Sequence, residues 1–512
     1  MDSAEKNSAF DKRLKRQVIG KPHRFLAVVP LGFEKTFVRE MDFLRRESVE
    51  NQGTNSLDIK IAGDGKVEFT AKLVDAWKVV AFSRIANRIL MHIADFKAEN
   101  FRELEKKAAE IPWELFLTTN HQPLTTIHVS CKHSRLYHSD AVAERLQKVI
   151  EGGSLPLAAA PAGSSATPSA GTPRNAPKSE ASDLVPHTSS LYVTLIDDRC
   201  TLWLDLAGEE LYKRGHERFV NDAPLKETIA AAILQEAFNA AILTTNHQPL
   251  ITLIDPMSGS GTFSLEAAYM ANALIPGKCR DFALKHQPAF KPATWNHIVN
   301  SANANPNPSL RRNNDSELSL QRNDNSMLSL QGNDDSILSL RRNEVTAAIK
   351  STIHKIITSD ISEKAVGIIT HNVECCPLAN IAPSTAAPTI SPQLRDFFSY
   401  TAKEIADLCG ESSPVIALNP PYGKRLDFDA PKLYTQIGKK LAELARELAP
   451  RGKQLTVAIL APKDDSRPGS KYTCTANLLH ECPALDPQQN SDAKNIVTSH
   501  GGLSLNAIIA KI

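Results

Sequence analysis

The residues of this chain most suited to chemistry are Asn419, Pro420, Pro421 and Tyr422, which follow an apolar run at 415–418. Such a run is typical of a buried parallel strand, and the two prolines end it and stiffen its tip. The amide of Asn419 can accept and donate hydrogen bonds, and Tyr422 offers a flat ring. Together they suit a planar group with an exocyclic amine, whose N–H groups would point to the carbonyls of Asn419 and Pro420 while its face stacks on the ring. An Asn-Pro turn at a strand end is the alternative.

A glycine-rich turn precedes this stretch in the chain. Residues 255–262 read DPMSGSGT and lie between an apolar strand at 250–254 and a helix expected at 263–272. A nucleotide-type site requires this context of strand, turn and helix, in which Gly259 and Gly261 allow close approach and the helix N-terminus offers N–H groups. No Gly-Lys-Ser/Thr follows, which disfavours a triphosphate loop, and a tight turn without a ligand is the alternative. The binding residues predicted here are Asp255, Pro256, Ser258, Gly259, Gly261 and Thr262.

Two acidic residues at expected strand ends follow the glycine-rich turn. Asp360, with Ile361 beside it, could accept hydrogen bonds from ribose hydroxyls, and Asp396 with Phe397 could serve the amino group and ring face of an adenine. Each acid alone is more often an ordinary surface residue. The order of glycine turn, ribose acid, adenine acid and Asn-Pro-Pro-Tyr resembles that of Rossmann-like methyltransferases. This resemblance implies that the chain binds S-adenosylmethionine, that Asn419 is one of the residues that bind it, and that no metal is needed.

The N-terminal half adds a second resemblance. Three parts of it are similar to a THUMP-containing bacterial methyltransferase. They are residues 67–116, the segment SRLYHSD at 134–140, and an expected hairpin at 191–205 that leads into 208–216. That family methylates the exocyclic N2 of a guanine in large-subunit (23S) ribosomal RNA. The resemblance implies that rRNA is the partner, held by THUMP and the basic N-terminus. This chain departs from the family pattern at Ser258, where the family has Cys, and at Met257, where it has an aromatic residue.

The resemblance implies an α/β fold class with four segments. These are a basic flexible tail at 1–20, a ferredoxin-like region at 21–60, a THUMP RNA-binding domain at 61–207 and a Rossmann-like methyltransferase domain at 208–512. Strands that alternate with helices in the last segment predict a mostly parallel, seven-stranded sheet with helices on both faces. The chain ends at the expected closing strand, so we expect one methyltransferase domain.

Two stretches are predicted to be insertions. Residues 151–188 are rich in Pro, Ala, Ser, Gly and Thr and contain no Phe, Trp or Tyr, which predicts disorder. Residues 300–343 repeat a Leu every ten residues among Asn, Asp and Ser, a period too short for a solenoid. The heptapeptide TTNHQPL at 118–124 recurs at 244–250, which indicates inserted sequence rather than a shared function. Residues 75–90 show the apolar period of one helix.

Composition bounds the remaining possibilities. The 512 residues suit two to four domains, and a hydrophobic content of 42% with a net charge of +2 is ordinary for a soluble protein. No apolar run approaches the roughly 20 residues of a membrane span, and no signal sequence is evident. The eight cysteines form no CxxC pair. We therefore expect a cytoplasmic protein with reduced thiols, no membrane partner and an oligomeric state that stays open.

Three alternative functions remain open from the sequence. Asn-Pro-Pro-Tyr alone does not separate guanine N2 from adenine N6, so a nucleic-acid N6-adenine methyltransferase is the nearest alternative. Methylation of a protein glutamine uses a similar motif but leaves the THUMP-like region unexplained. A different class is a catalytically inactive RNA-binding factor in ribosome assembly, whose cofactor site has decayed amid the insertions. Cofactor binding without methyl transfer to any RNA would favour it.

Overall fold

The computed structural model describes residues 3–49, 58–118, 126–152, 189–216, 218–220, 224–242, 250–304, 352–380, 388–422, 429–464 and 473–512. Most of both predicted insertions and most of each heptapeptide copy lie outside the described residues. The chain divides into two compact units. The first comprises Met1–His23, Leu90–Gly208 and Phe282–Lys291, and the second comprises Arg24–Ile89, Glu209–Asp281 and Pro292–Ile512. No described helix has both the length and the apolar composition for crossing a bilayer.

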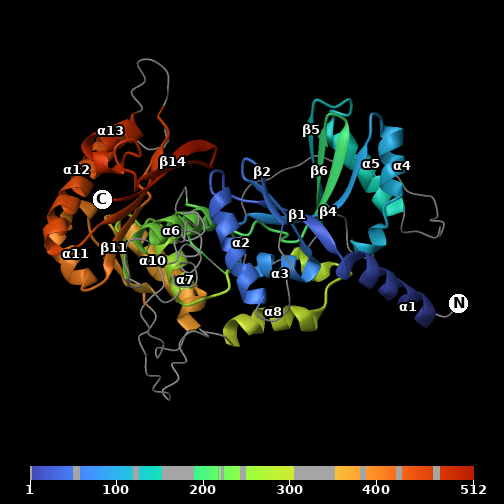
Figure 1. Ribbon diagram of the computed structural model, residues 1–512, viewed down its shortest axis with the longest axis horizontal. Helices are drawn as coiled ribbons and strands as arrows, with labels where there is room; N and C mark the ends of the chain where they lie inside the picture. The colour runs from blue at the N-terminus through green and yellow to red at the C-terminus, as the bar shows by residue number, and fades with distance from the viewer. Residues whose placement is uncertain are drawn as a thin grey trace, which may run out of the picture. The chain divides into compact units, whose positions relative to one another are not determined.

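The second unit contains a seven-stranded sheet with the order β10-β9-β8-β11-β12-β14-β13. Figure 1 labels β11 and β14 of this sheet. Strands β10, β9, β8, β11 and β12 are parallel, and β14 runs antiparallel to both β12 and β13. This order and direction confirm the predicted Rossmann-like class. The strands are β8 (Ile251–Asp255), β9 (Ile353–Asp360), β10 (Pro392–Leu394), β11 (Ser413–Leu418), β12 (Thr456–Pro462), β13 (Lys494–His500) and β14 (Leu503–Lys511).

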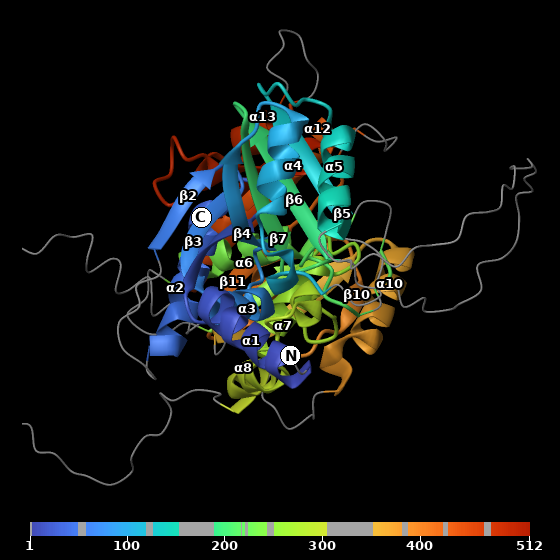
Figure 2. The same cartoon turned by 90° about the vertical axis from the view of Figure 1, so that its right-hand side faces the viewer.

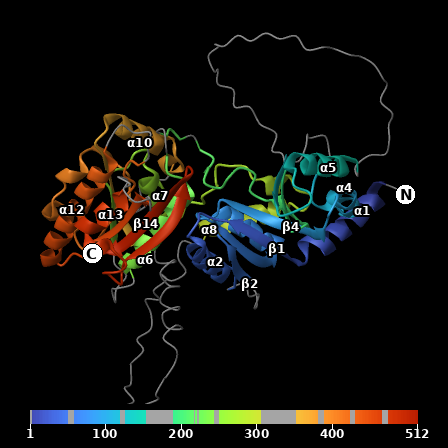
Figure 3. The same ribbon diagram turned by 90° about the horizontal axis from the view of Figure 1, so that it is seen from above.

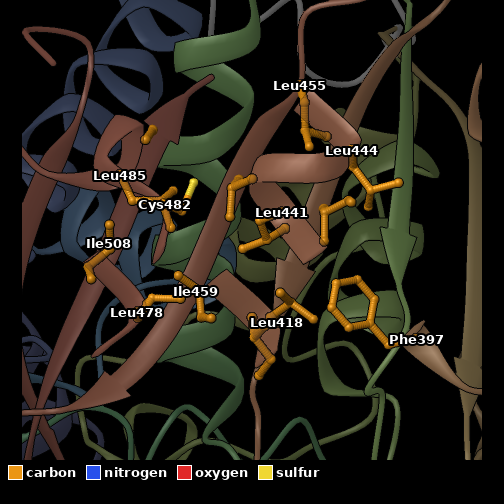
Figure 4. Close-up of a cluster of buried hydrophobic side chains, with 14 of the residues drawn as sticks. Phe397, Leu418, Leu441, Leu444, Leu455, Ile459, Leu478, Cys482, Leu485 and Ile508 are labelled. Atoms are coloured by element: carbon orange, nitrogen blue, oxygen red, sulfur yellow. The ribbon is translucent and has the colours of Figure 1, made fainter. Parts of the chain in front are cut away.

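Helices cover both faces of this sheet. Helices α6 and α7 pack together, and α6 also packs on β11, β12 and β14 (Figure 3). Helices α11, α12 and α13 share one apolar cluster with every second residue of the central strands, such as Ile416 and Leu418 of β11 (Figure 4). Because side chains alternate along a strand, the buried Val415 and Ala417 face the other way. The helices are α6 (Glu227–Ile242), α7 (Thr262–Ala271), α8 (Pro292–Ala304), α10 (Glu363–Cys375), α11 (Ala402–Cys409), α12 (Ala430–Leu448) and α13 (Cys474–Glu481).

The N-terminal part of the second unit is anchored to α6. It consists of most of β1 (Pro22–Val28), with α2 (Glu34–Val49), β2 (Asp58–Gly63), β3 (Lys66–Lys72) and α3 (Leu73–Phe82). Glu236 of α6 accepts a 2.6 Å hydrogen bond from Thr36 and pairs with Arg39, both on α2. Lys494 of β13 lies 3.4 Å from its second oxygen. The buried carboxylate is therefore satisfied by groups from two other elements, α2 and β13, as a buried charge requires.

The first unit contains four strands of a seven-stranded sheet, with helices on one face of them. Its strands follow the order β4-β7-β6-β5, and α4 and α5 lie side by side across them (Figure 2). Strands β6 and β7 form the predicted hairpin, whose turn residues Asp197 and Asp198 have left-handed φ values of 50° and 62°. The elements are α1 (Ser3–Leu14), most of β4 (Arg88–Lys97), α4 (Phe101–Ala109), β5 (Thr126–Lys132), α5 (Ser139–Gly152), β6 (Ser190–Ile196) and β7 (Arg199–Asp205).

The helix predicted over residues 75–90 is wrong in its second half. Helix α3 ends at Phe82, and β4 begins at Arg88. Ser83 turns the chain because its hydroxyl donates to Glu40 at 2.7 Å and accepts from the amide of Ala86 at 3.0 Å. The apolar residues that suggested one helix lie on α3, in the turn after it and on β4, so their spacing matched a helical period by coincidence.

Shortening Leu441 to Ala should lower the free energy of unfolding by about 2–5 kcal/mol, because Leu441 is fully buried in the cluster between α12 and the sheet. Chemical denaturation followed by circular dichroism measures the change. The matched control is Lys439→Ala on the same helix, whose side chain is mostly exposed. An equal loss in both variants would contradict the assigned packing.

Candidate functional site

The glycine-rich turn connects β8 to α7 through two left-handed residues. Gly259 has φ +56° and Gly261 has φ +80°, which L side chains rarely adopt. A Cβ at Gly261 would also lie 3.2 Å from the side chain of Ile369 on α10, whereas a Cβ at Gly259 would meet nothing within 4 Å. Gly261 therefore serves packing as well as the turn, and the backbone at Gly259 is open to an approaching ligand.

Asp360 joins the end of β9 to this turn. One carboxylate oxygen accepts from the amide of Gly259 at 2.9 Å, and the other accepts from the amide of Ser362 at 2.9 Å. Ser258 donates its amide and its hydroxyl to the carbonyl of Ser359, at 3.1 and 2.8 Å. The structure thus brings together three of the residues that the sequence placed in one site, although about a hundred positions separate them.

Asp255 lies beneath the turn rather than at its surface. It is 1% exposed, and one of its oxygens accepts from the amide and hydroxyl of Ser264 at 3.2 and 2.7 Å. Its other oxygen has no hydrogen-bond partner among the described residues. Burial raises the pKa of Asp255 to about 7, hydrogen bonds from Ser264 oppose the rise, and the nearby Asp360 carboxylate adds to it. This geometry supports the start of α7 and offers little direct access to a ligand.

Two exposed apolar side chains flank the ends of β9 and β10. Ile361 is 71% exposed and directly follows β9, and Leu394 is 60% exposed at the end of β10, paired in register with Asp360. Asp396 is half-buried two residues later, with one oxygen accepting from the amide of Phe398 at 3.0 Å. The ring of Phe397 is 2% exposed and packs in the apolar cluster (Figure 4). The exposed apolar surface here comes from Ile361, which the sequence analysis named, and from Leu394, which it did not.

Asn419, Pro420, Pro421 and Tyr422 follow β11 at the edge where β8 also ends. Asn419 is half-buried, and its amide oxygen is buried without a hydrogen-bond partner in the described part of the chain. An unsatisfied buried acceptor costs about 1–3 kcal/mol, which an incoming N–H donor would recover. Pro420 is buried and Pro421 exposed, and burial raises the pKa of Tyr422 to about 12. The Tyr422 hydroxyl therefore stays neutral at physiological pH.

Arg218 and Asn372 hold the glycine-rich turn from outside, and neither was predicted. Arg218 pairs with Glu227 and donates to the hydroxyls of Ser260 and Thr262. The amide nitrogen of Asn372 on α10 donates to the carbonyl of Ser260 at 3.1 Å.

Asn372 also binds the segment that carries Arg218. Its side chain accepts from the amide of Phe219 at 2.8 Å and donates to the carbonyl of Phe219 at 2.9 Å. His371 stacks on the Phe219 ring at 4.0 Å, with 7° between the ring planes. No local spacing could have revealed this cluster, because Arg218 lies 42 positions before Ser260 and Asn372 lies 112 positions after it.

One known family matches the part of the chain that carries this site, and several relatives share sequence with the chain. The family described as "RMKL-like, methyltransferase domain" matches residues 214–459. YpsC of Bacillus subtilis (strain 168), described as a candidate RNA methyltransferase, is 28% identical over 280 residues, which are 54% of this chain and 62% of YpsC. The ribosomal RNA large subunit methyltransferase K/L of Allochromatium vinosum is 25% identical over 397 residues, 74% of this chain and 42% of that enzyme. The chain thus spans less than two thirds of the length of these relatives.

Solved structures share the fold across nearly the whole chain. A possible methylase from Clostridium difficile 630 superposes with a TM-score of 0.60 at 19% identity, covering 96% of this chain and 98% of that one. The protein SMU.472, crystallised in complex with SAH, has a TM-score of 0.59 at 21% identity, with the same coverage. The architecture of both units is therefore one found in methyltransferase-like proteins.

Replacing Asp255 by Asn should change how stability depends on pH. The pKa of Asp255 is raised in the folded protein from 3.8 to about 7, so the folded state holds a proton that the unfolded state releases. This group's stabilising contribution is complete below about pH 4 and is lost as the pH rises to 7, by about 4 kcal/mol. Unfolding by urea, without cofactor, should show that the free energy of unfolding of Asp255→Asn rises relative to that of the wild type as the pH increases from about 4 to 7. If the free energies of unfolding of the two proteins change with pH in the same way, the raised pKa of Asp255 is contradicted.

Proposed function

We propose that this chain is an S-adenosylmethionine-dependent methyltransferase acting on the exocyclic N2 of a guanine in large-subunit ribosomal RNA. The observation that carries the proposal is the unsatisfied amide oxygen of Asn419, at the sheet edge where the glycine-rich turn of β8 also lies. The matched family and the names of the relatives support the same reaction class.

The described residues fit the cofactor at several points. The open backbone at Gly259 and the N-terminus of α7 suit the carboxylate of the cofactor. Asp360 suits its ribose, and Asp396 with the exposed side chains of Ile361 and Leu394 suits its adenine. The bound cofactor would supply a methyl group already activated on a sulfonium. The protein therefore contributes mainly by positioning, which can supply a large share of a rate enhancement.

Asn419 and Pro420 orient the amine in the proposed reaction. The amide oxygen of Asn419 and the carbonyl oxygen of Pro420 accept the two N–H groups of the exocyclic nitrogen, so that its lone pair points at the methyl group. A nitrogen–carbon bond forms as the sulfur–carbon bond breaks, and the nitrogen then releases one proton to solvent. Tyr422 stacks on the extruded base. Because its hydroxyl remains protonated, Tyr422 acts through its ring rather than as a base.

The N-terminal half supplies the RNA contacts in this proposal. We assign residues 61–207 to a THUMP domain, 21–60 to a ferredoxin-like region and 1–20 to a basic tail, with the methyltransferase domain at 208–512. The strands β4, β7, β6 and β5 with α4 and α5 form a compact unit, which supports a binding function for this part of the chain.

Asn419→Ala should lower methyl transfer by about 100- to 1,000-fold, because it removes a preorganised acceptor from the amine. Cofactor affinity, measured calorimetrically, should change only a few-fold. The assay transfers labelled methyl to naked rRNA and identifies the product by nucleoside analysis, where N2-methylguanosine supports the proposal and N6-methyladenosine would replace it. The matched control is Asn495→Ala on β13, an exposed position. Cofactor binding by the wild type without transfer to any RNA would identify a non-catalytic RNA-binding factor.

Tyr422→Phe should retain activity within a few-fold, since the ring keeps its stacking surface and the neutral hydroxyl has no acid–base role. Tyr422→Ala should reduce kcat/KM by about 5- to 150-fold, the range expected for the loss of one base–aromatic stack. Similar losses in both variants would point to the hydroxyl instead of the ring.

A further inference from the structure

The layer β4-β7-β6-β5 of the first unit has two unlike faces. Alternate residues of β6 (Leu191, Val193 and Leu195) are buried. Helices α4 and α5 lie across one face of the layer (Figure 2). The residues between them, Tyr192, Thr194 and Ile196, are half-buried or exposed and point to the other face.

A row of aromatic rings crosses this second face. The strand registers pair His92 with Trp203, Trp203 with Tyr192 and Tyr192 with His128, one ring from each of the four strands. His92 meets Trp203 edge-on at 5.3 Å, and His128 stacks on Tyr192 at 4.7 Å with 21° between the planes. Trp203 is only 5% exposed, whereas His128 is exposed and Tyr192 half-buried. The accessible end of the row is therefore the Tyr192–His128 stack.

Two further rows lie parallel to the rings. The next accessible row begins with Asp95 of β4, whose carboxylate lies 3.0 Å from His92, and continues with the hydroxyls of Thr201, Thr194 and Ser130 on β7, β6 and β5. The row after it pairs Lys97 with Arg199, Arg199 with Ile196 and Ile196 with Lys132. A hollow of about 510 Å³ opens on this face, lined by Lys97, Thr194, Ile196, Asp197, Arg199 and Thr201.

The basic row retains positive charge. Lys97 pairs with Glu99 at 2.5 Å, but Arg199 and Lys132 form no ion pair with any residue that the structure describes. Both are exposed. Because they lie four strand positions from the rings, about 13 Å separates the stacking surface from the cations.

We propose that this face binds single-stranded RNA, with a base stacked against Tyr192 and His128 and phosphates held by Arg199 and Lys132. The hydroxyl row between them suits the 2′-hydroxyl groups of the riboses. A duplex would hide its bases from the rings, whereas unpaired nucleotides can splay onto an aromatic sheet face. The inference rests on the proposed function, because it identifies an unpaired segment of the RNA substrate as the element that docks.

Replacing Tyr192 by Ala tests the stacking. Fluorescence anisotropy with a labelled oligouridylate of about twelve nucleotides should show binding weakened by about 5- to 150-fold, and Tyr192→Phe should bind as the wild type does. The matched control is Tyr137→Ala in the same unit, because Tyr137 is largely exposed and its ring contacts His138 rather than the row. A duplex of the same length should bind more weakly than the single strand. Equal binding of the two, or unchanged affinity in Tyr192→Ala, would overturn the proposal.

Replacing Arg199 by Gln tests the phosphate contact. The slope of log affinity against log salt should fall by about 0.7 for one lost contact to a single strand. Arg145→Gln on α5, where Arg145 pairs with Glu105, should leave the slope unchanged. Equal slopes in the two variants would exclude the assigned basic row.

Two controls separate this proposal from the proposed function. Circular dichroism and calorimetric cofactor binding establish that Tyr192→Ala is folded. If the wild type methylates no RNA but its single-strand binding depends on Tyr192, the docking face stands and the methyltransferase assignment fails. If the wild type methylates rRNA and Tyr192→Ala keeps its KM, the docking face fails and the assignment stands.

Discussion

The candidate site depends on the parallel register of β8 with its two neighbours, β9 and β11. After β8 the chain builds β9 and β10 on one side of it and then crosses to form β11 on the other. The strand order therefore reverses at β8, which places the carboxyl ends of β8, β9 and β11 along one crevice, where α/β sheets bind ligands. The glycine-rich turn, Asp360 and Asn419 each emerge from one of these ends. A shift of one residue in any strand would turn its side chains to the opposite face.

Buried polar groups then fix the shape of the glycine-rich turn. Asp360 holds the turn through the Gly259 amide, Asp255 supports the start of α7, and Asn372 and Arg218 bind its outer side. A neutral hydrogen bond contributes about 0.5–1.5 kcal/mol net and one to a charged group about 1.5–3 kcal/mol, so each contact adds a modest stability. Their main effect is orientation, because each buried donor or acceptor tolerates few alternative positions without losing its partner.

The prediction from sequence succeeded where local pattern and tertiary role agree. Strand β8, its turn and α7 follow from a short apolar run and two glycines, and the β6–β7 hairpin follows from alternation on both sides of a turn. It failed over residues 75–90, where the apolar spacing suited one helix but Ser83 bonds to Glu40 and ends it. The Phe397 ring illustrates the same limit, because its apolar character suited a ligand and a core equally well, and the structure places it in the core.

The sequence by itself determined the Rossmann-like fold class and the residues that follow its strands, because those signals reside in short runs of apolar residues, glycines and prolines. Only the tertiary structure decided which of these residues meet. It joined Asp360 to Gly259, left the Asn419 amide oxygen without a partner among the described residues, and aligned four rings across β4, β7, β6 and β5. The physical reason is that strand pairing brings distant segments together, and no local spacing encodes the register in which they pair.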